Sequence, residues 1–67
     1  MELIVNGEKV VIPSNIGTVS ELLQHFQLDQ KVAIVEVNHD ILEKRNHQET
    51  HLSNGDRVEI VHFVGGG

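Results

Sequence analysis

A single amphipathic helix, set between two groups of strand patterns, most restricts how these 67 residues can fold. Thr18 and Glu21 form a capping box, in which the threonine hydroxyl caps the helix and the glutamate reaches back. Apolar residues then recur at helical spacing in one stripe, far more often a core face than a cofactor site. The stripe is Val19, Leu22, Leu23 and Phe26, and the helix is expected to end near Gln27. One short helix covers one face of a sheet, so we predict an α+β fold.

A β-hairpin is predicted before the helix. Asn6-Gly7 is the strongest short hairpin signal, because both central residues of a type I′ turn need positive φ. A two-residue loop places Val5 opposite Glu8, and Leu3 opposite Val10. The face predicted to join the core is Leu3, Val5, Val10 and Ile12, and the residues on the other face, expected to stay partly exposed, are Ile4 and Val11.

Two strands and an irregular segment are predicted next. Residues 31–37 are almost continuously apolar, which is typical of a central strand buried on both faces. A turn follows, and then a very short strand at residues 41–42. The segment 43–51 is polar and is expected to be irregular, with Leu52 as its anchor.

The last strand pattern runs from residue 57 to residue 64. Its side chains alternate, so that Val58 and Ile60 face one way while Val61 and Phe63 face the other. A helix between the second and third strands permits the first and last strands to pair in parallel. We therefore predict a mixed sheet of four to five strands with one main helix on one face. The predicted core is Leu3, Val5, Val10, Ile12, Val19, Leu22, Leu23, Phe26, Ile34, Val58 and Ile60.

The composition argues against several classes of function. A net charge of −5 and only two aromatic residues disfavour nucleic-acid binding. The absence of cysteine removes thiolate metal sites and thiol catalysis, and it is compatible with the cytoplasm. The apolar runs are too short to span a bilayer, and residues 1–4 do not resemble a signal peptide. A domain this small has no room for a deep active site, so we expect a partner protein to supply much of any chemistry.

The five histidines do not form a recognisable metal or catalytic pattern. His47 and His51 lie four residues apart, which is the spacing of two metal ligands on a helix. Their segment does not read as a helix and offers no further ligands, so both are expected on the surface. No metal site is predicted.

Three glycines follow the last strand. Gly65, Gly66 and Gly67 have no side chains to pack and lose the most freedom when ordered. We expect residues 1–64 to form the domain and residues 65–67 to be a flexible tail. The tail is either a frayed end or a carboxylate presented on a thin tether, which can enter a channel too narrow for any side chain.

The chain resembles the ThiS/MoaD-type family of ubiquitin-like β-grasp sulfur carriers, and most of all the ThiS carriers of thiamine biosynthesis. Three stretches carry the likeness: residues 37–42 with Arg45 after them, residues 52–60, and residues 64–67. The hairpin at Asn6-Gly7 and the helix entry at residues 17–19 also resemble the family, so the likeness covers the whole chain. His39 stands where the family often has glycine, which indicates a different turn type there.

The resemblance implies a protein co-substrate rather than an enzyme. An E1-like adenylyltransferase of the ThiF type would use ATP and magnesium to adenylate the carboxylate of Gly67, which then becomes a thiocarboxylate. The sulfur would come from cysteine through a desulfurase and would pass to a thiazole synthase of the ThiG type. The chain itself would bind no cofactor. Gly66 and Gly65 would thread the partner's channel, and the docking contacts would be Val64, Phe63 and Val61.

Some alternatives stay open from the sequence. Val61 and Phe63 could instead be buried beneath the irregular segment or a loop, and Ile4 and Val11 could either extend the docking row or be ordinary scattered surface residues. The function could also be that of a carrier for another pathway, such as the small subunit of molybdopterin synthase. A ubiquitin-like protein modifier and an interaction module with a passive tail are the remaining alternatives.

Overall fold

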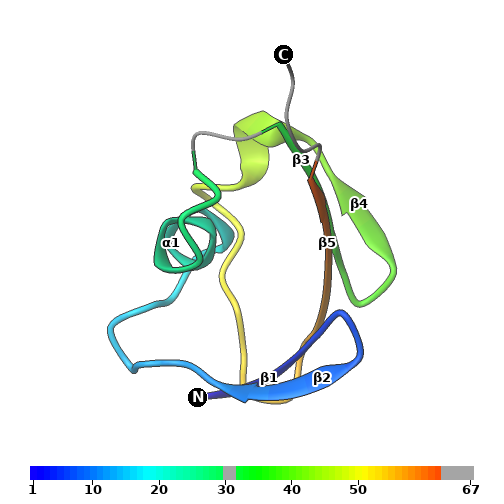
Figure 1. The fold of residues 1–67 in the computed structure, drawn as a ribbon. Helices are drawn as coiled ribbons and strands as arrows, with labels where there is room; N and C mark the ends of the chain where they lie inside the picture. The colour runs from blue at the N-terminus through cyan, green and yellow to red at the C-terminus, as the bar shows by residue number, and fades with distance from the viewer. Residues whose placement is uncertain (30–31, 63–67) are drawn as a thin grey trace.

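The computed structural model describes residues 1–29 and 32–62, which form a five-stranded mixed sheet with one α-helix on one face (Figure 1). The strand order is β2-β1-β5-β3-β4. The elements in chain order are β1 (Glu2–Val5), β2 (Glu8–Val11), α1 (Val19–His25), β3 (Ala33–Val37), β4 (Asp40–Leu42), the 3₁₀ helix η1 (Lys44–Asn46) and β5 (Arg57–His62). The predicted α+β class and element order are confirmed.

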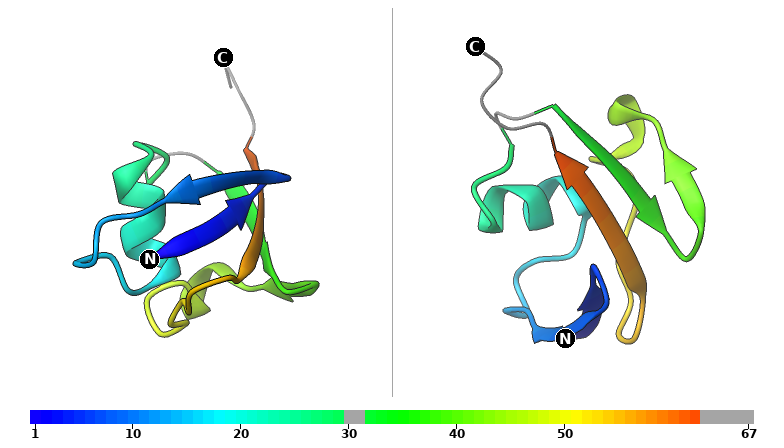
Figure 2. Two further views of the ribbon diagram at one scale, coloured as in Figure 1. Left: turned by 90° about the horizontal axis from the view of Figure 1, so that it is seen from below. Right: turned by 45° about the vertical axis from the view of Figure 1, so that its right-hand side comes forward.

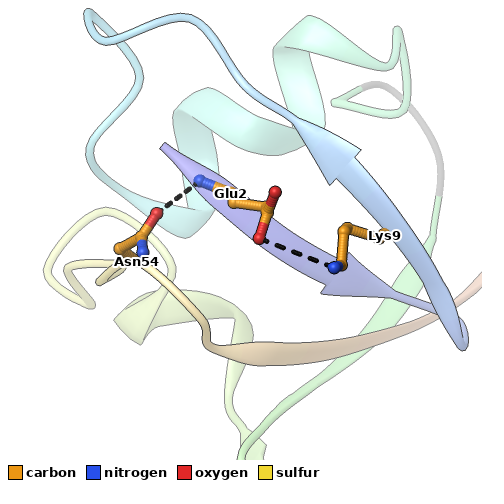
Figure 3. Close-up of polar contacts among 3 residues, drawn as sticks. All are labelled: Glu2, Lys9 and Asn54. Carbon is orange, nitrogen blue, oxygen red and sulfur yellow. Dashed lines mark hydrogen bonds and ion pairs between the residues drawn. The ribbon is translucent and has the colours of Figure 1, made fainter.

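The first hairpin has the register that the sequence predicts. β1 and β2 are antiparallel, with Leu3 opposite Val10 and Val5 opposite Glu8. Asn6 and Gly7 have φ values of 50° and 84°, so both central turn residues lie in the left-handed region. The Glu2 amide donates to the Asn54 side chain at 2.6 Å, and the Glu2 carboxylate lies 4.0 Å from the Lys9 ammonium (Figure 3). The first contact attaches the hairpin to the turn before β5.

The capping box of α1 is present as predicted. The Glu21 amide donates to the Thr18 hydroxyl at 3.2 Å, and the Glu21 carboxylate accepts from the Gly17 and Thr18 amides at 2.9 and 3.1 Å. These hydrogen bonds, that from Gly17 first, lower the pKa of Glu21. The α-helix ends at His25, two residues before the predicted end.

β5 is the central strand of the sheet, between β1 and β3 (Figure 2). It pairs in parallel with β1, where Val5 lies opposite Val58, and antiparallel with β3, where Val35 lies opposite Ile60. The parallel pairing of the first and last strands is the arrangement that the intervening helix permits. The sheet face toward α1 is called the inner face below, and the opposite face is called the outer face.

The core lies between the inner face and α1. Its buried apolar residues are Leu3, Ile12, Ile16, Val19, Leu22, Leu23, Val35, Val37, Leu52, Val58 and Ile60. Seven of the predicted core residues are in this set, and Val5, Val10 and Phe26 are partly buried against it. Leu52 is the anchor that was predicted for the polar segment.

The prediction for Ile34 is wrong, because β3 has the opposite phase. Val35 and Val37 point inward beside Ile60 and Val58, so Ile34 lies on the outer face and is 47% exposed. β3 is flanked by strands on both sides, as predicted, but it is not buried on both faces. A continuous apolar run hides which face is buried, and a single helix leaves the outer face uncovered.

The expectation of a different turn at His39 is also corrected. Asn38 and His39 have φ values of 50° and 74°, the positive pair that a type I′ turn requires. The Asn38 side chain donates to Asp56 and accepts from the Arg57 amide, both at 3.0 Å. These two bonds hold the β3–β4 turn against the start of β5.

Candidate functional site

The candidate site is the carboxyl end of β5, where the described chain ends at His62. On one edge, β3 holds this end through the pair of Ala33 with His62. On the other edge, β1 has already turned away into its hairpin, since its last pair with β5 is Val5 with Val58. A different group must therefore satisfy the β5 backbone beyond Val58.

Asn6 supplies that group. Its amide N–H donates to the Val58 carbonyl at 2.9 Å, which continues the ladder of β1. Its side-chain oxygen accepts from the Ile60 amide at 2.7 Å, and its side-chain nitrogen donates to the Ile60 carbonyl at 3.1 Å. The carboxamide thus replaces a neighbouring strand, and β5 is held on both edges almost to its end. Sequence reasoning assigned Asn6 to the turn but missed this second role.

The outer face presents apolar side chains beside the end of β5. Val61 is 56% exposed and lies opposite Ile34 in the β3–β5 register. The alternation predicted for β5 is confirmed at Val61, so its burial beneath the irregular segment is excluded. We call Val61 and Ile34 the outer patch. Ile4 is half-buried, whereas Val11 is 79% exposed.

A pair of like charges borders the outer patch. Glu36 lies directly opposite Glu59, two residues along the strands from the pair of Ile34 with Val61 and therefore on the same face. Like charges at directly opposed positions destabilise an antiparallel pair. The edge of the outer patch is therefore acidic and electrostatically unfavourable in the isolated chain.

The remaining predicted site residues lie outside the described residues. They are Phe63, Val64, Gly65, Gly66 and Gly67. Their roles stay predictions.

The prediction of a surface position for His47 is wrong. Its imidazole is 6% exposed, because the segment after η1 folds back over the start of α1. There the Ser20 amide donates to the His47 carbonyl, and the Val19 amide to the Thr50 carbonyl, both at 3.0 Å. Burial, with a smaller contribution from the Lys44 charge, lowers the pKa of His47. His51 is exposed as predicted.

Two grooves flank this end of the molecule. One, of about 670 Å³, lies between α1 and the segment around η1, and the other, of about 440 Å³, lies between the β1–β2 hairpin and residues 26–28. Leu28 lines both grooves. Within the described ranges, no three metal-ligating side chains gather at one point, and no helix is long and apolar enough to cross a membrane.

Comparison with known proteins identifies the family. The model of the ThiS family matches residues 1–67. The chain belongs to the ThiS family. It is 45% identical over 62 residues to the sulfur carrier protein ThiS of Bacillus subtilis, and the match covers 92% of this chain and 94% of that one. A crystal structure of the thiamine biosynthesis protein ThiS from Geobacter metallireducens has a TM-score of 0.82 and 35% identity, with all of both chains covered.

Family membership assigns the broad function and confirms the fold. The five-stranded mixed sheet with one helix is the β-grasp fold of ThiS structures. This ThiS-family chain is a sulfur carrier of thiamine biosynthesis and not an enzyme. A second relative has a different architecture: the thiazole synthase of Paramagnetospirillum magneticum is 36% identical over 67 residues, which is all of this chain and 20% of that protein.

Proposed function

We propose that the carboxylate of Gly67 is the reacting group of this carrier. The observation that carries the proposal is the match to the ThiS family model, which runs through Gly67. A carboxylate is a poor electrophile because it is anionic and has no good leaving group. It must therefore be activated before sulfur can be attached to it.

The proposed cycle divides this difficult step into two easier ones. In the first, an E1-like enzyme of the ThiF type lets the Gly67 carboxylate attack the α-phosphorus of ATP, and magnesium pyrophosphate leaves. In the second, the outer sulfur of a protein persulfide attacks the acyl carbon and AMP leaves. A partner thiol then attacks the inner sulfur of the acyl disulfide, which forms a disulfide and releases the thiocarboxylate. The sulfur comes from cysteine through a desulfurase. ATP and magnesium belong to the partner, and the carrier needs no cofactor of its own.

The geometry of β5 supports the presentation of this terminus. Asn6 and Ala33 hold the strand on its two edges, so the end of β5 at His62 has a defined position and direction. We call His62, after which residues 63–67 follow, the root of the tail. Five residues follow His62, and an extended chain of that length reaches at most about 18 Å. A partner must therefore bring its reacting centre within that distance of the sheet.

Docking through the outer patch would satisfy that requirement. Val61 lies next to the root of the tail and is exposed together with Ile34. Phe63 and Val64 extend the proposed docking row toward Gly65 and Gly66. Apolar residues at the centre of an interface contribute most of its binding energy when partner atoms exclude water from them.

The acceptor of the sulfur is proposed to be a thiazole synthase of the ThiG type. A protein named thiazole synthase contains a region similar to the whole of this chain, which supports a physical link between carrier and synthase. The proposal places the cycle in the cytoplasm, where ATP and a cysteine desulfurase are available. Neither nucleic acid nor a membrane takes part.

Changing the length of the tail tests the proposal. One alanine added after Gly67 moves the carboxylate by about 3.3–3.6 Å, and deletion of Gly67 withdraws it by the same step. Reacting atoms must lie about 3–3.5 Å apart, so we expect both variants to fail. The measurements are ATP–pyrophosphate exchange with the cognate E1-like enzyme and intact mass for the exchange of one oxygen for sulfur.

The thermal midpoint serves as the control, because neither change affects the core. If the lengthened or shortened chain is adenylated as fast as the native one, Gly67 is not the reacting residue.

A further inference from the structure

The larger groove lies at the same end of the molecule as the carboxyl end of β5. It is the groove of about 670 Å³ between α1 and the segment around η1. Figures 1 and 2 show η1 at the end of the sheet toward which β5 points. Ala33 lines the groove and is also the β3 partner of His62, so one residue connects the groove with the root of the tail. We call it the η1 groove.

The η1 groove gathers hydrogen-bond donors around a small apolar floor. Leu23, Leu28 and Ala33 contribute apolar surface. The polar side chains along it are Ser20, Gln24, Asp29, Lys44, Arg45, His47 and Gln48. Within the described part of the chain, the side chains of Ser20, Gln24 and Gln48 make no hydrogen bond to another residue. The groove therefore holds donors that the isolated chain does not use.

The charge of the η1 groove differs from that of the whole chain. The net charge is −5, yet two of the four lysines and arginines among the described residues line this groove. Lys44 makes no ion pair with any described residue. Arg45 is paired with Glu43 at 2.8 Å, but both side chains are well exposed, so a competing carboxylate can displace that contact at little cost. Among the described residues along the groove, Asp29 is the only acidic one.

His47 adds an unused polar atom to the residues that line this groove. Its Nε2 is buried, and no described residue hydrogen-bonds to it. A buried polar atom without a partner costs free energy, so this wall of the groove is poorly satisfied in the isolated chain.

We propose that the η1 groove is a second docking point for the adenylating partner, which places acidic side chains against Lys44 and Arg45 while the outer patch and the tail engage elsewhere. The proposal rests on the proposed function, because the partner is the enzyme that activates Gly67. The unused donors and the charge of Lys44, which no described acid neutralises, suit a carboxylate-bearing segment, and Ala33 makes the groove continuous with the root of the tail. Contacts on both sides of β5 would align the tail with the active site of the partner.

Charge reversal at Lys44 tests the proposal. We expect Lys44→Glu to lower kcat/KM for ATP–pyrophosphate exchange about three- to tenfold at low salt, and we expect the loss to shrink at high salt as the charges are screened. Lys44→Gln should give a smaller loss of the same kind. Lys44→Arg, which keeps the charge, should stay within about twofold of the native chain.

A matched control separates the groove from net charge. Ser14→Asp combined with Asn15→Asp also makes the chain more negative by two charges, as Lys44→Glu does. These exposed residues lie in the loop after β2, far from η1 (Figure 1). The control should retain native kcat/KM, and thermal melting should show that every variant is folded.

The outcomes distinguish this proposal from the one on which it rests. If the native chain is not adenylated at all, the proposed function fails and this inference fails with it. If the native chain is adenylated and Lys44→Glu matches it, or if the control loses as much as Lys44→Glu, only the groove proposal is overturned. A loss confined to thiazole formation would assign the groove to the synthase and would also overturn the proposal as stated.

Discussion

Residues with positive φ show where a substitution can raise or lower the stability of this fold. His39 has a φ of 74°, a conformation that costs most side chains about 1–2 kcal/mol and glycine almost nothing. Its neighbour Asn38 also has positive φ but uses its side chain to bind Asp56 and Arg57. The two turn residues therefore have similar dihedral angles and different reasons for their identity.

We expect His39→Gly to stabilise the fold by about 0.5–1 kcal/mol, since relief of the strained φ exceeds the entropic cost of glycine. Asn38→Gly should instead destabilise it, because two hydrogen bonds to the start of β5 are lost. Urea denaturation of the three proteins measures both changes. Equal effects of the two substitutions would show that φ alone governs this turn.

His47 makes the stability of the fold depend on pH. Its folded pKa is lowered from 6.5 by burial and then by Lys44, so protonation favours the unfolded chain. Its stabilising contribution is complete above pH 6.5 and is lost progressively as the pH falls below that value. Glu21 contributes at lower pH. Because its folded pKa is lowered from 4.5, its ionised carboxylate stabilises the fold above pH 4.5, and this contribution is lost as the pH falls further.

We expect the native chain to lose stability between pH 7.5 and pH 5.5, and His47→Leu to lose less over the same interval. Urea midpoints at the two pH values measure the difference, and His51→Leu, at an exposed site, serves as the control. If His47→Leu and the native chain lose the same amount, another group titrates in this range.

At the scale of elements, the carboxamide of Asn6 completes the edge of β5 that β1 leaves open. The substitution must be chosen so that the turn itself survives, because Asn6 also has a φ of 50°. Glycine accepts that φ but lacks the carboxamide.

Asn6→Gly should therefore destabilise the chain by about 1–3 kcal/mol through the two lost bonds to Ile60. Asn6→Ala should cost more, because alanine adds backbone strain to the same loss. Hydrogen exchange at the Ile60 amide should rise in both variants. Unchanged exchange at Ile60 would show that the carboxamide does not protect this strand.

At the scale of the whole molecule, the residues that the structure describes contain one α-helix, which covers one of the two faces of the sheet. A domain of this size cannot cover both faces, so the outer face keeps exposed apolar residues such as Val61, Ile34 and Ile41. An exposed apolar patch bordered by charge is typical of a protein-binding surface.

Adjacent residues of β5 allow docking to be separated from folding. Val61→Asp places a charge on the exposed outer face, so we expect at least a tenfold loss of adenylation and about 1 kcal/mol or less of stability. Ile60→Asp buries the charge in the core and should unfold the chain. Pyrophosphate exchange and thermal melting measure the two effects. A folded Val61→Asp chain with native adenylation would remove Val61 from the docking row.

Local features of the structure were determined by the sequence alone. The hairpin at Asn6-Gly7, the capping box from Thr18 to Glu21, and the alternation of Val58, Ile60 and Val61 all depend on residues close together in the chain. Such patterns specify backbone dihedrals and side-chain faces directly, so the element order and most of the core followed from them. The sulfur-carrier function came from the family resemblance rather than from these patterns.

Other features were decided only by tertiary structure, because they depend on which distant segments come together. The apolar run that includes Ile34 and Val35 does not show which of its side chains face the core. Only the register of β3 with β5 decides this. His47 looks like a surface residue until its segment folds over the start of α1. From the sequence, Asn6 is a turn residue. Its second role arises because β1 ends before it can pair with Ile60, which leaves the Ile60 peptide free to bind the Asn6 side chain. In each case the free energy that decides the outcome lies in contacts between residues far apart in the chain, and no local pattern records them.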